Sequence, residues 1–277
     1  MKTWMITGCS SGIGRGIAEA ALKRGDCVVV TARNKDHIMD FEPEYSDRVL
    51  KVSLELTKDE MIEQAVKLAT DRFGKIDVLV NNAGHGYRSA LEEGEADGIN
   101  EVFQTNLFGA VKLIQKVLPQ MRERKDGAIV NISSIAAISA GVGSGYYAAT
   151  KAALELASDA LWQEVSPLGI KVMIVEPGVF RTRFYDDSLK GTAVKIGDYS
   201  ETAGKTRVEN VKNDHKQPGD PMRGGEVIVH TIMQDNYPRR LLLGTDAIHF
   251  AREQYQMRLE EIDAWENISG MSDYKDV

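Results

Sequence analysis

Short, continuously apolar runs alternate along this chain with longer segments that have helical periodicity. Val28-Val29-Val30 and Val78-Leu79-Val80 are examples of the apolar runs. A strand that is apolar at every position is buried on both faces, which is typical of a parallel sheet covered by helices. Alternation of such strands with helices predicts an α/β fold with a doubly wound parallel sheet.

The expected elements cover most of the chain. Strands are expected at Trp4–Thr7, Cys27–Ala32, Val49–Leu54, Val78–Asn81, Ala128–Ile132, Lys171–Val175 and Arg240–Leu243, and helices at about 14–24, 58–73, 96–124, 145–165 and 221–234. The irregular, glycine-containing stretch at about 183–220 is expected to form a lid over a cleft, with a surface loop as the alternative. Apolar spacing from about 245 to 270 predicts a C-terminal helical tail, which could pack on the domain or on another subunit. We therefore expect one domain over residues 1–277.

The amino-acid composition of the chain argues against several classes of function. The chain has 277 residues, is 43% hydrophobic and carries a formal net charge of -7. An acidic balance without a basic run argues against a nucleic-acid partner. No apolar stretch approaches the roughly 20 residues of a membrane span, and no signal peptide is evident, so a cytoplasmic location is expected. Cys9 and Cys27 are too few for a disulfide framework and are predicted to be packing residues, and no metal-ligand spacing is apparent.

A glycine-rich turn follows the first expected strand and leads directly into a helix. Its sequence, Thr7-Gly8-Cys9-Ser10-Ser11-Gly12-Ile13-Gly14, has glycines at positions 8, 12 and 14. Glycines at these points permit a tight turn, close approach of a pyrophosphate, and phosphate binding at a helix N-terminus. A turn without any ligand is the alternative, but its place after the first strand favours a dinucleotide cofactor. The expected contacts are Gly8, Ser10, Ser11, Gly12, Ile13 and Gly14.

The end of the second strand bears on the choice of cofactor. An acid at this point accepts hydrogen bonds from a ribose 2′-hydroxyl, whereas a basic residue accommodates a 2′-phosphate. The chain has Thr31-Ala32-Arg33-Asn34-Lys35, without an acid. Because the guanidinium of Arg33 suits phosphate, we predict NADP(H); a solvated loop arginine is the alternative.

Tyr147 and Lys151 lie four residues apart and so share one face of the expected helix. A nearby ammonium lowers the pKa of a phenol from about 10 toward neutrality, which makes a proton donor for a developing alkoxide. The spacing alone also fits a half-buried tyrosine and a solvated lysine. Tyr146 is five residues from Lys151 and is expected to point away from that face.

These motifs occur in a characteristic order: the glycine turn, Asn81-Asn82-Ala83-Gly84, Ser134, and then Tyr147 with Lys151. In that order they resemble the single-domain branch of the short-chain dehydrogenases/reductases, over nearly the whole chain. The resemblance implies a parallel sheet of about seven strands and a nicotinamide cofactor. The nearest likeness is to NADP-type enzymes related to hydroxysteroid and retinol dehydrogenases, through runs such as 29–33, 176–182 and 241–244.

The resemblance also implies roles for individual residues. Ser134 matches the catalytic serine, with Ser133 as the adjacent alternative, and Asn106 matches the asparagine that holds a water in a proton relay. Tyr147 is then the acid, and Lys151 tunes it and binds the nicotinamide ribose. An asparagine bonded to its own helix backbone is the alternative for Asn106.

Further cofactor and substrate contacts follow from the same likeness. Cofactor contacts are expected at Asn82, Ala83, Gly84, Pro177, Gly178, Val179 and Thr182. Near the adenine the family carries an acid in an Asp-Val-Thr-like run, and this chain departs from it with Glu55 and Leu56. Substrate contacts are expected from Ser134, Tyr147, His85 and Phe184, whereas Phe180 and Tyr185 could form an apolar wall or simply pack beneath the loop.

The sequence thus predicts an NADP(H)-dependent oxidoreductase. It would transfer hydride between the cofactor and a carbonyl or alcohol, such as that of a hydrophobic steroid-like or retinoid-like compound. A non-catalytic NAD(P)-binding regulator on the same fold is the alternative. The resemblance also implies a homodimer or homotetramer that pairs through long helices.

Overall fold

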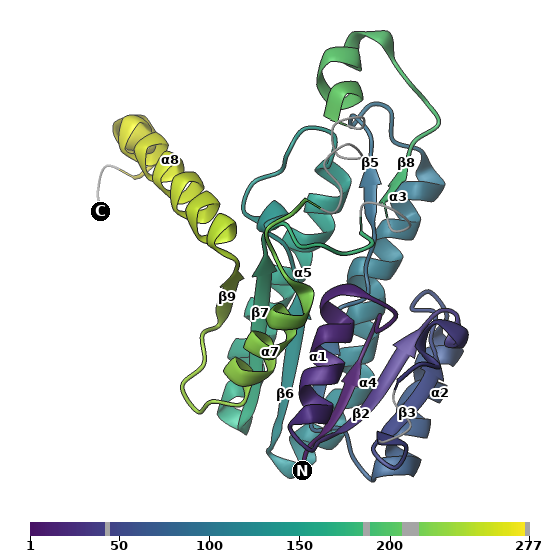
Figure 1. Cartoon of the computed structure of the whole chain (residues 1–277). Helices are drawn as coiled ribbons and strands as arrows, with labels where there is room; N and C mark the ends of the chain where they lie inside the picture. The colour runs from purple at the N-terminus through teal and green to yellow at the C-terminus, as the bar shows by residue number, and fades with distance from the viewer. Residues whose placement is uncertain (42–44, 185–188, 207–215, 275–277) are drawn as a thin grey trace.

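The computed structural model describes residues 1–41, 45–184, 189–206 and 216–274. Seven strands form one parallel sheet in the order β3-β2-β1-β4-β6-β7-β9 (Figure 1). They are β1 (Thr3–Ile6), β2 (Cys27–Ala32), β3 (Val49–Ser53), β4 (Val78–Asn81), β6 (Gly127–Ile132), β7 (Ile170–Pro177) and β9 (Arg240–Leu243). This confirms the predicted doubly wound parallel sheet. The strand order reverses between β1 and β4, and ligands bind at such a point in open α/β sheets.

Helices cover both faces of the sheet. They are α1 (Gly12–Lys23), α2 (Asp59–Phe73), α3 (Ala96–Phe103), α4 (Gly109–Arg124), α5 (Gly145–Val165), α7 (Pro221–Ile232) and α8 (Thr245–Gly270). Shorter helical turns are η1 (Lys35–Ile38), η3 (Gln104–Phe108), η4 (Ile135–Ala137), η5 (Ser166–Leu168), η6 (Gly197–Tyr199) and η7 (Ser200–Gly204).

The hydrophobic core lies in two layers, one on each side of the sheet. Trp4 and Ile6 of β1 pack in one layer with α1 and α7, and Met5 packs in the other with α2, α4 and α5. Successive residues of a strand point to opposite faces, so a continuously apolar strand supplies both layers. Figure 1 shows α1 and α7 on one side of the sheet.

The single helix predicted at 96–124 is interrupted by a π-helical turn. The chain runs through α3, then η3, then α4 without leaving helical structure. A π-turn adds one residue to the helical repeat and is frequent at functional sites. Here it falls on Asn106, which is 1% exposed.

Two short strands were missed by the sequence reasoning. β5 (Gly86–Arg88) and β8 (Leu189–Gly191) pair in parallel as a separate two-stranded sheet. Three residues are too few to show a period of two, which explains the miss. β8, η6 and η7 belong to the expected lid, of which residues 185–188 and 207–215 lie outside the described part.

The expected C-terminal tail is the helix α8. Ala247 and Ala251, in its first two turns, are buried, and every residue from Tyr255 to Tyr274 is exposed. Figure 1 shows α8 projecting away from the rest of the molecule. No described helix is long and apolar enough to cross a membrane.

Candidate active site

A cavity of about 550 Å³ opens at the carboxyl ends of the strands, where the sheet order reverses. It brings together most of the residues predicted from the sequence. Those that line it are Gly8, Ser10, Ser11, Gly12, Ile13, Arg33, Glu55, Leu56, Asn82, Ala83, Gly84, His85, Ser134, Tyr147, Lys151, Pro177, Gly178, Val179, Thr182 and Phe184. Gly14 and Asn106 lie behind its wall.

The glycine turn has the geometry that a phosphate requires. Gly8 and Gly12 have φ angles of +72° and +63°, which side chains rarely tolerate. A Cβ atom at Gly14 would lie 2.3 Å from Asn82 Nδ2 and 2.4 Å from the Gly8 oxygen. Gly14 therefore lets α1 pack against the turn, and the helix N-terminus faces the cavity without an acid in its first turn.

Thr7, which follows β1, and Asn82, which follows β4, hold the glycine turn in place. Asn82 Nδ2 donates hydrogen bonds to the Thr7 and Gly8 oxygens at 2.8 and 3.1 Å. The Thr7 hydroxyl accepts from the backbone amides of Asn82 and Ala83, both at 2.9 Å. Thr7 was not predicted as a site residue; its place directly after the first strand was the available signal.

Arg33, directly after β2, lines the cavity and is exposed. Within the described ranges no carboxylate forms an ion pair with it. Arg15, by contrast, is bound at 2.8 Å to both Glu19 and Asp40. The Arg33 guanidinium is thus a basic group that the cavity wall offers to a ligand.

Tyr147 and Lys151 lie together in the cavity wall, on one face of α5. Lys151 Nζ is 5.9 Å from the centre of the Tyr147 ring and donates a 2.8 Å hydrogen bond to the Ile132 oxygen. Lys151 is 4% exposed, and burial lowers its pKa to about 8, opposed by the charge of Glu155. The ammonium is therefore mostly charged at neutral pH and stands beside the phenol.

The two tyrosines and the two serines of the site differ in their partners. The Tyr146 hydroxyl donates to the Leu91 oxygen at 2.8 Å, so this tyrosine turns away from the cavity. The Ser133 hydroxyl, in a residue 3% exposed, donates to Glu155 at 2.6 Å. Ser134 is half-buried and accepts a hydrogen bond from the Ala136 amide. Its own proton remains available to a ligand, which favours Ser134 over Ser133.

Asn106 connects two parts of the site. Its side-chain oxygen accepts from the His85 amide at 3.0 Å, and its Nδ2 donates to the His85 oxygen and the Thr150 hydroxyl at 2.9 and 3.2 Å. A Cβ atom at Gly84 would lie 3.0 Å from Asn106 Oδ1 and 3.5 Å from Lys151 Nζ. Asn106 and Lys151 therefore both lie beside Gly84 and close to each other. Its role in a proton relay stays a prediction.

The predicted substrate contacts are at the Tyr147 end. The Phe184 ring is 5.5 Å from that of Tyr147, centre to centre. His85 is 7% exposed, and burial lowers its pKa, so the imidazole is neutral at pH 7. Phe180 both lines the cavity and belongs to the core, whereas Tyr185 lies outside the described residues.

Comparison with known proteins agrees with this geometry. A family model described as short chain dehydrogenase matches residues 2–192. The chain belongs to the short-chain dehydrogenase family. It is 33% identical to the oxidoreductase BOA17 of Botryotinia fuckeliana, over 97% of this chain and 98% of the relative. It is 32% identical to a 3-ketodihydrosphingosine reductase of Bacteroides thetaiotaomicron, over 87% of each chain.

Among solved structures, a short-chain dehydrogenase from Streptomyces avermitilis matches with a TM-score of 0.91. It is 40% identical, and the match covers 99% of this chain and all of the other. Both fold and family thus identify an oxidoreductase, as the motifs predicted.

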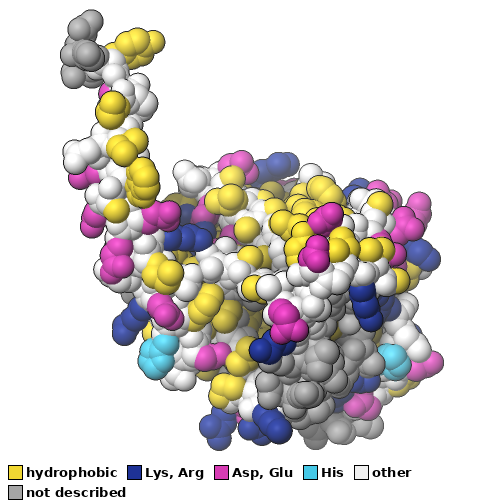
Figure 2. Space-filling model, turned by 90° about the horizontal axis from the view of Figure 1, so that it is seen from above, with side chains coloured by type: hydrophobic (Ala, Val, Ile, Leu, Met, Phe, Trp, Pro, Cys, Tyr) yellow, Lys and Arg dark blue, Asp and Glu magenta, His cyan; other side chains and the backbone are white. Residues whose placement is uncertain are grey.

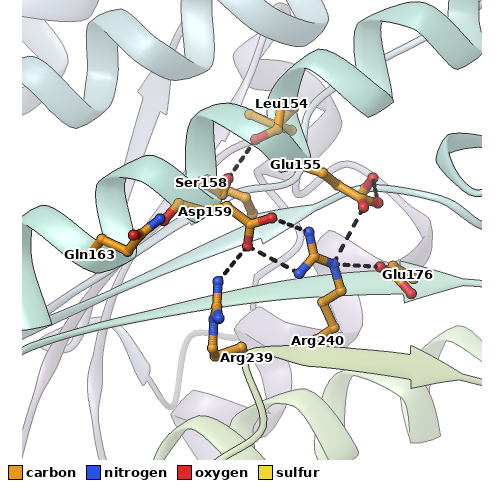
Figure 3. A network of polar contacts seen from close by, with 10 residues as sticks. Leu154, Glu155, Ser158, Asp159, Gln163, Glu176, Arg239 and Arg240 are labelled. Carbon is orange, nitrogen blue, oxygen red and sulfur yellow. Dashed lines mark hydrogen bonds and ion pairs between the residues drawn. The ribbon is translucent and has the colours of Figure 1, made fainter. Parts of the chain in front are cut away.

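Next to Ser133, the chain buries two carboxyl groups that were not predicted from the sequence (Figure 3). Glu155 of α5 and Glu176 of β7 are 8% and 1% exposed. Arg240 of β9 approaches both, with Nε at 3.6 Å from Glu155 and 3.3 Å from Glu176. Its other nitrogens bind Asp159.

Burial disfavours the charged form of both carboxyl groups, so the pKa of each is raised. Burial, and then the charge of Glu155, raise the pKa of Glu176 from its ordinary 4.5 to about 7. Glu155 also holds Ser133, and Glu176 immediately precedes Pro177 of the cavity wall. The network therefore ties α5, β6, β7 and β9 together beneath the site.

Glu176→Gln is expected to change how stability depends on pH. A group whose pKa is raised on folding stabilises the protein fully below its unfolded pKa and loses that contribution as pH rises through its folded pKa. Between pH 4.5 and 8 the wild type should therefore lose about 1–3 kcal/mol of unfolding free energy that the variant keeps. Urea unfolding across this range measures the difference. Glu123→Gln, exposed on α4, is the control, and a difference that does not vary with pH would contradict the raised pKa of Glu176.

Proposed function

We propose that this chain is an NADP(H)-dependent oxidoreductase that interconverts a carbonyl group and an alcohol on a hydrophobic substrate. One observation carries the proposal: a phosphate-fitting glycine turn and the Ser134–Tyr147–Lys151 group line a single cavity. Gly8, Ser10, Ser11, Gly12 and Ile13 would hold the pyrophosphate. We also place the activity in the cytoplasm, in line with the chain's composition.

When bound, the nicotinamide supplies the hydride. Tyr147 and Ser134 donate hydrogen bonds to the carbonyl oxygen, and Tyr147 passes its proton to that oxygen as negative charge grows there. The positive charge of Lys151 eases release of the phenolic proton. Asn106, beside Gly84 and Lys151, is the proposed route by which a water-borne proton is returned. Alcohol oxidation is the reverse sequence.

Two features support a hydrophobic substrate. Phe184, Val142 and Phe250 line the cavity, and the Phe184 ring lies beside that of Tyr147. Among the relatives, the reductase from Bacteroides thetaiotaomicron is named for a ketone on a long-chain base. Both favour a carbonyl with an extended apolar part.

The test is oxidation of NADPH and of NADH, followed by absorbance, with a panel of steroid, retinoid and aliphatic ketones and aldehydes. We expect turnover with apolar members of the panel and a lower KM for NADPH. Cofactor binding without turnover of any compound would instead support the alternative, a cofactor-binding regulator.

Arg33→Gln is expected to raise the KM for NADPH by about tenfold or more, because a hydrogen-bonded charge pair contributes about 1.5–3 kcal/mol. The KM for NADH should change little, since NADH has no 2′-phosphate. Lys35→Gln, an exposed cation two residues away that does not line the cavity, is the matched control. Equal effects of Arg33→Gln on both cofactors would refute the NADP(H) assignment.

A further inference from the structure

The exposed part of α8 carries a stripe of large apolar residues. Tyr255, Leu259, Ile262 and Trp265 are 43%, 55%, 61% and 56% exposed. Steps of four, three and three residues place them on one helix face. Figure 2 shows α8 extending from the body with hydrophobic side chains along it. A stripe of this size, rimmed by polar residues, is typical of a protein contact surface.

The residue types in the stripe are those typical of a protein–protein interface. Tyr and Trp are the residues that most often dominate binding energy at protein interfaces. Arg258 donates a hydrogen bond to the Ile138 oxygen of the body, and the helix runs for about 18 Å beyond Arg258, so Ile262 and Trp265 cannot reach their own domain while α8 stays straight. The stripe needs a partner from outside the chain.

The charges on α8 select the partner and its orientation. Residues 259–270 contain four acids, Glu260, Glu261, Asp263 and Glu266, and no Lys or Arg. The preceding part of the helix, residues 245–258, is neutral overall, with Arg252 and Arg258 balanced by Asp246 and Glu253. A parallel pair of α8 helices would place acid beside acid, whereas an antiparallel pair places the acidic half of each helix beside the arginines of the other. An anionic lipid surface would repel the acidic half.

We propose that α8 pairs antiparallel with α8 of a second copy of this chain, about a two-fold axis near Leu259. The stripes then face each other, with Tyr255 of each copy near Ile262 of the other. Arg252 and Glu266 lie on the same side of the stripe, and in an antiparallel pair such positions meet across the axis. The interface is separate from the proposed chemistry and does not rest on it.

The pairing would also link the two cavities. Phe250, in the second turn of α8, lines the cavity, and Asp246 accepts a 2.7 Å hydrogen bond from the Val179 amide. Each α8 helix is therefore anchored in the cavity wall of its own copy.

Light scattering after size exclusion, over a range of concentrations, tests the contact. Leu259→Lys is expected to halve the mass of the wild-type assembly and to weaken association about a hundredfold, because it places two charges at the axis. Met257→Lys, at 56% exposure on the opposite side of the helix, is the matched control and should leave the mass unchanged. A wild type that is monomeric at every concentration, or a Leu259→Lys variant with wild-type mass, would overturn the proposal.

Charge reversal tests the orientation. Arg252→Glu should weaken association about tenfold, and adding Glu266→Arg should restore it, because the two positions meet only in an antiparallel pair. Failure of the second change to restore association would overturn the antiparallel arrangement. Co-sedimentation of monomeric wild type, but not of Leu259→Lys, with phosphatidylcholine vesicles would overturn it in favour of a lipid surface.

Discussion

Replacement of Tyr147 by phenylalanine is expected to lower kcat by about 10²–10⁴-fold, the usual contribution of a positioned general acid. The variant keeps the ring that contacts Phe184 and loses the hydroxyl of a residue that lines the cavity. Affinity for NADPH, measured by fluorescence titration, should change little, because the phosphate cradle lies at the other end of the cavity.

The neighbouring tyrosine provides the control for this experiment. Tyr146→Phe makes the same chemical change one residue earlier, where the hydroxyl bonds the Leu91 oxygen instead of facing the cavity. It should retain most of the wild-type kcat. Near-normal turnover of Tyr147→Phe would remove Tyr147 from the acid role and leave Ser134 as the candidate.

Gly225→Ala is expected to destabilise the protein by about 3 kcal/mol, with a fall in Tm of about 10 °C. Gly225 of α7 and Gly16 of α1 are where these two helices touch, backbone to backbone. A Cβ atom at Gly225 would lie 2.1 Å from the Gly16 carbonyl carbon and 2.4 Å from the Ile17 nitrogen. Backbone atoms cannot rotate aside, so the helices must separate.

This steric cost outweighs a smaller gain in the opposite direction. Alanine is favoured over glycine in a helix by about 1 kcal/mol. Gly270→Ala, at a glycine with no atom within 4 Å of the added Cβ, is the control and should be close to neutral. Thermal and urea unfolding measure both variants. A Tm change below about 2 °C for Gly225→Ala would show that α1 and α7 part easily.

Separation of α1 from α7 would also reach the site, because the N-terminus of α1 forms part of the glycine turn. We therefore expect Gly225→Ala to weaken NADPH binding as well as stability. Tyr147→Phe, in contrast, affects turnover alone. The two variants thus separate the chemistry from the scaffold that carries the cofactor cradle.

Local patterns in the sequence were enough for the main elements. Each strand of the large sheet was expected, and the signal is strongest in β2 and β4, where burial on both faces requires a continuous apolar run. The glycine turn could be predicted from the sequence because a left-handed backbone conformation and close packing both require a residue without a side chain. Tyr147 and Lys151 were readable because a helix places residues four apart on one face.

Other features depend on residues that are distant in the chain. The choice between Ser133 and Ser134 follows from Glu155 on α5, which binds one hydroxyl and leaves the other free. The π-turn at Asn106 and the pairing of β5 with β8 have no local period that a sequence could reveal.

The amino-acid sequence by itself determined the doubly wound sheet, the cradle and the Tyr147–Lys151 face, since each follows from a repeat or a backbone requirement within a short segment. The tertiary structure alone decided that Glu155, Glu176 and Arg240 meet beneath the site and that α8 leaves the body with its stripe exposed. Contacts of this kind depend on how distant elements are arranged in the folded chain. The pattern of neighbouring residues in the sequence does not contain that information.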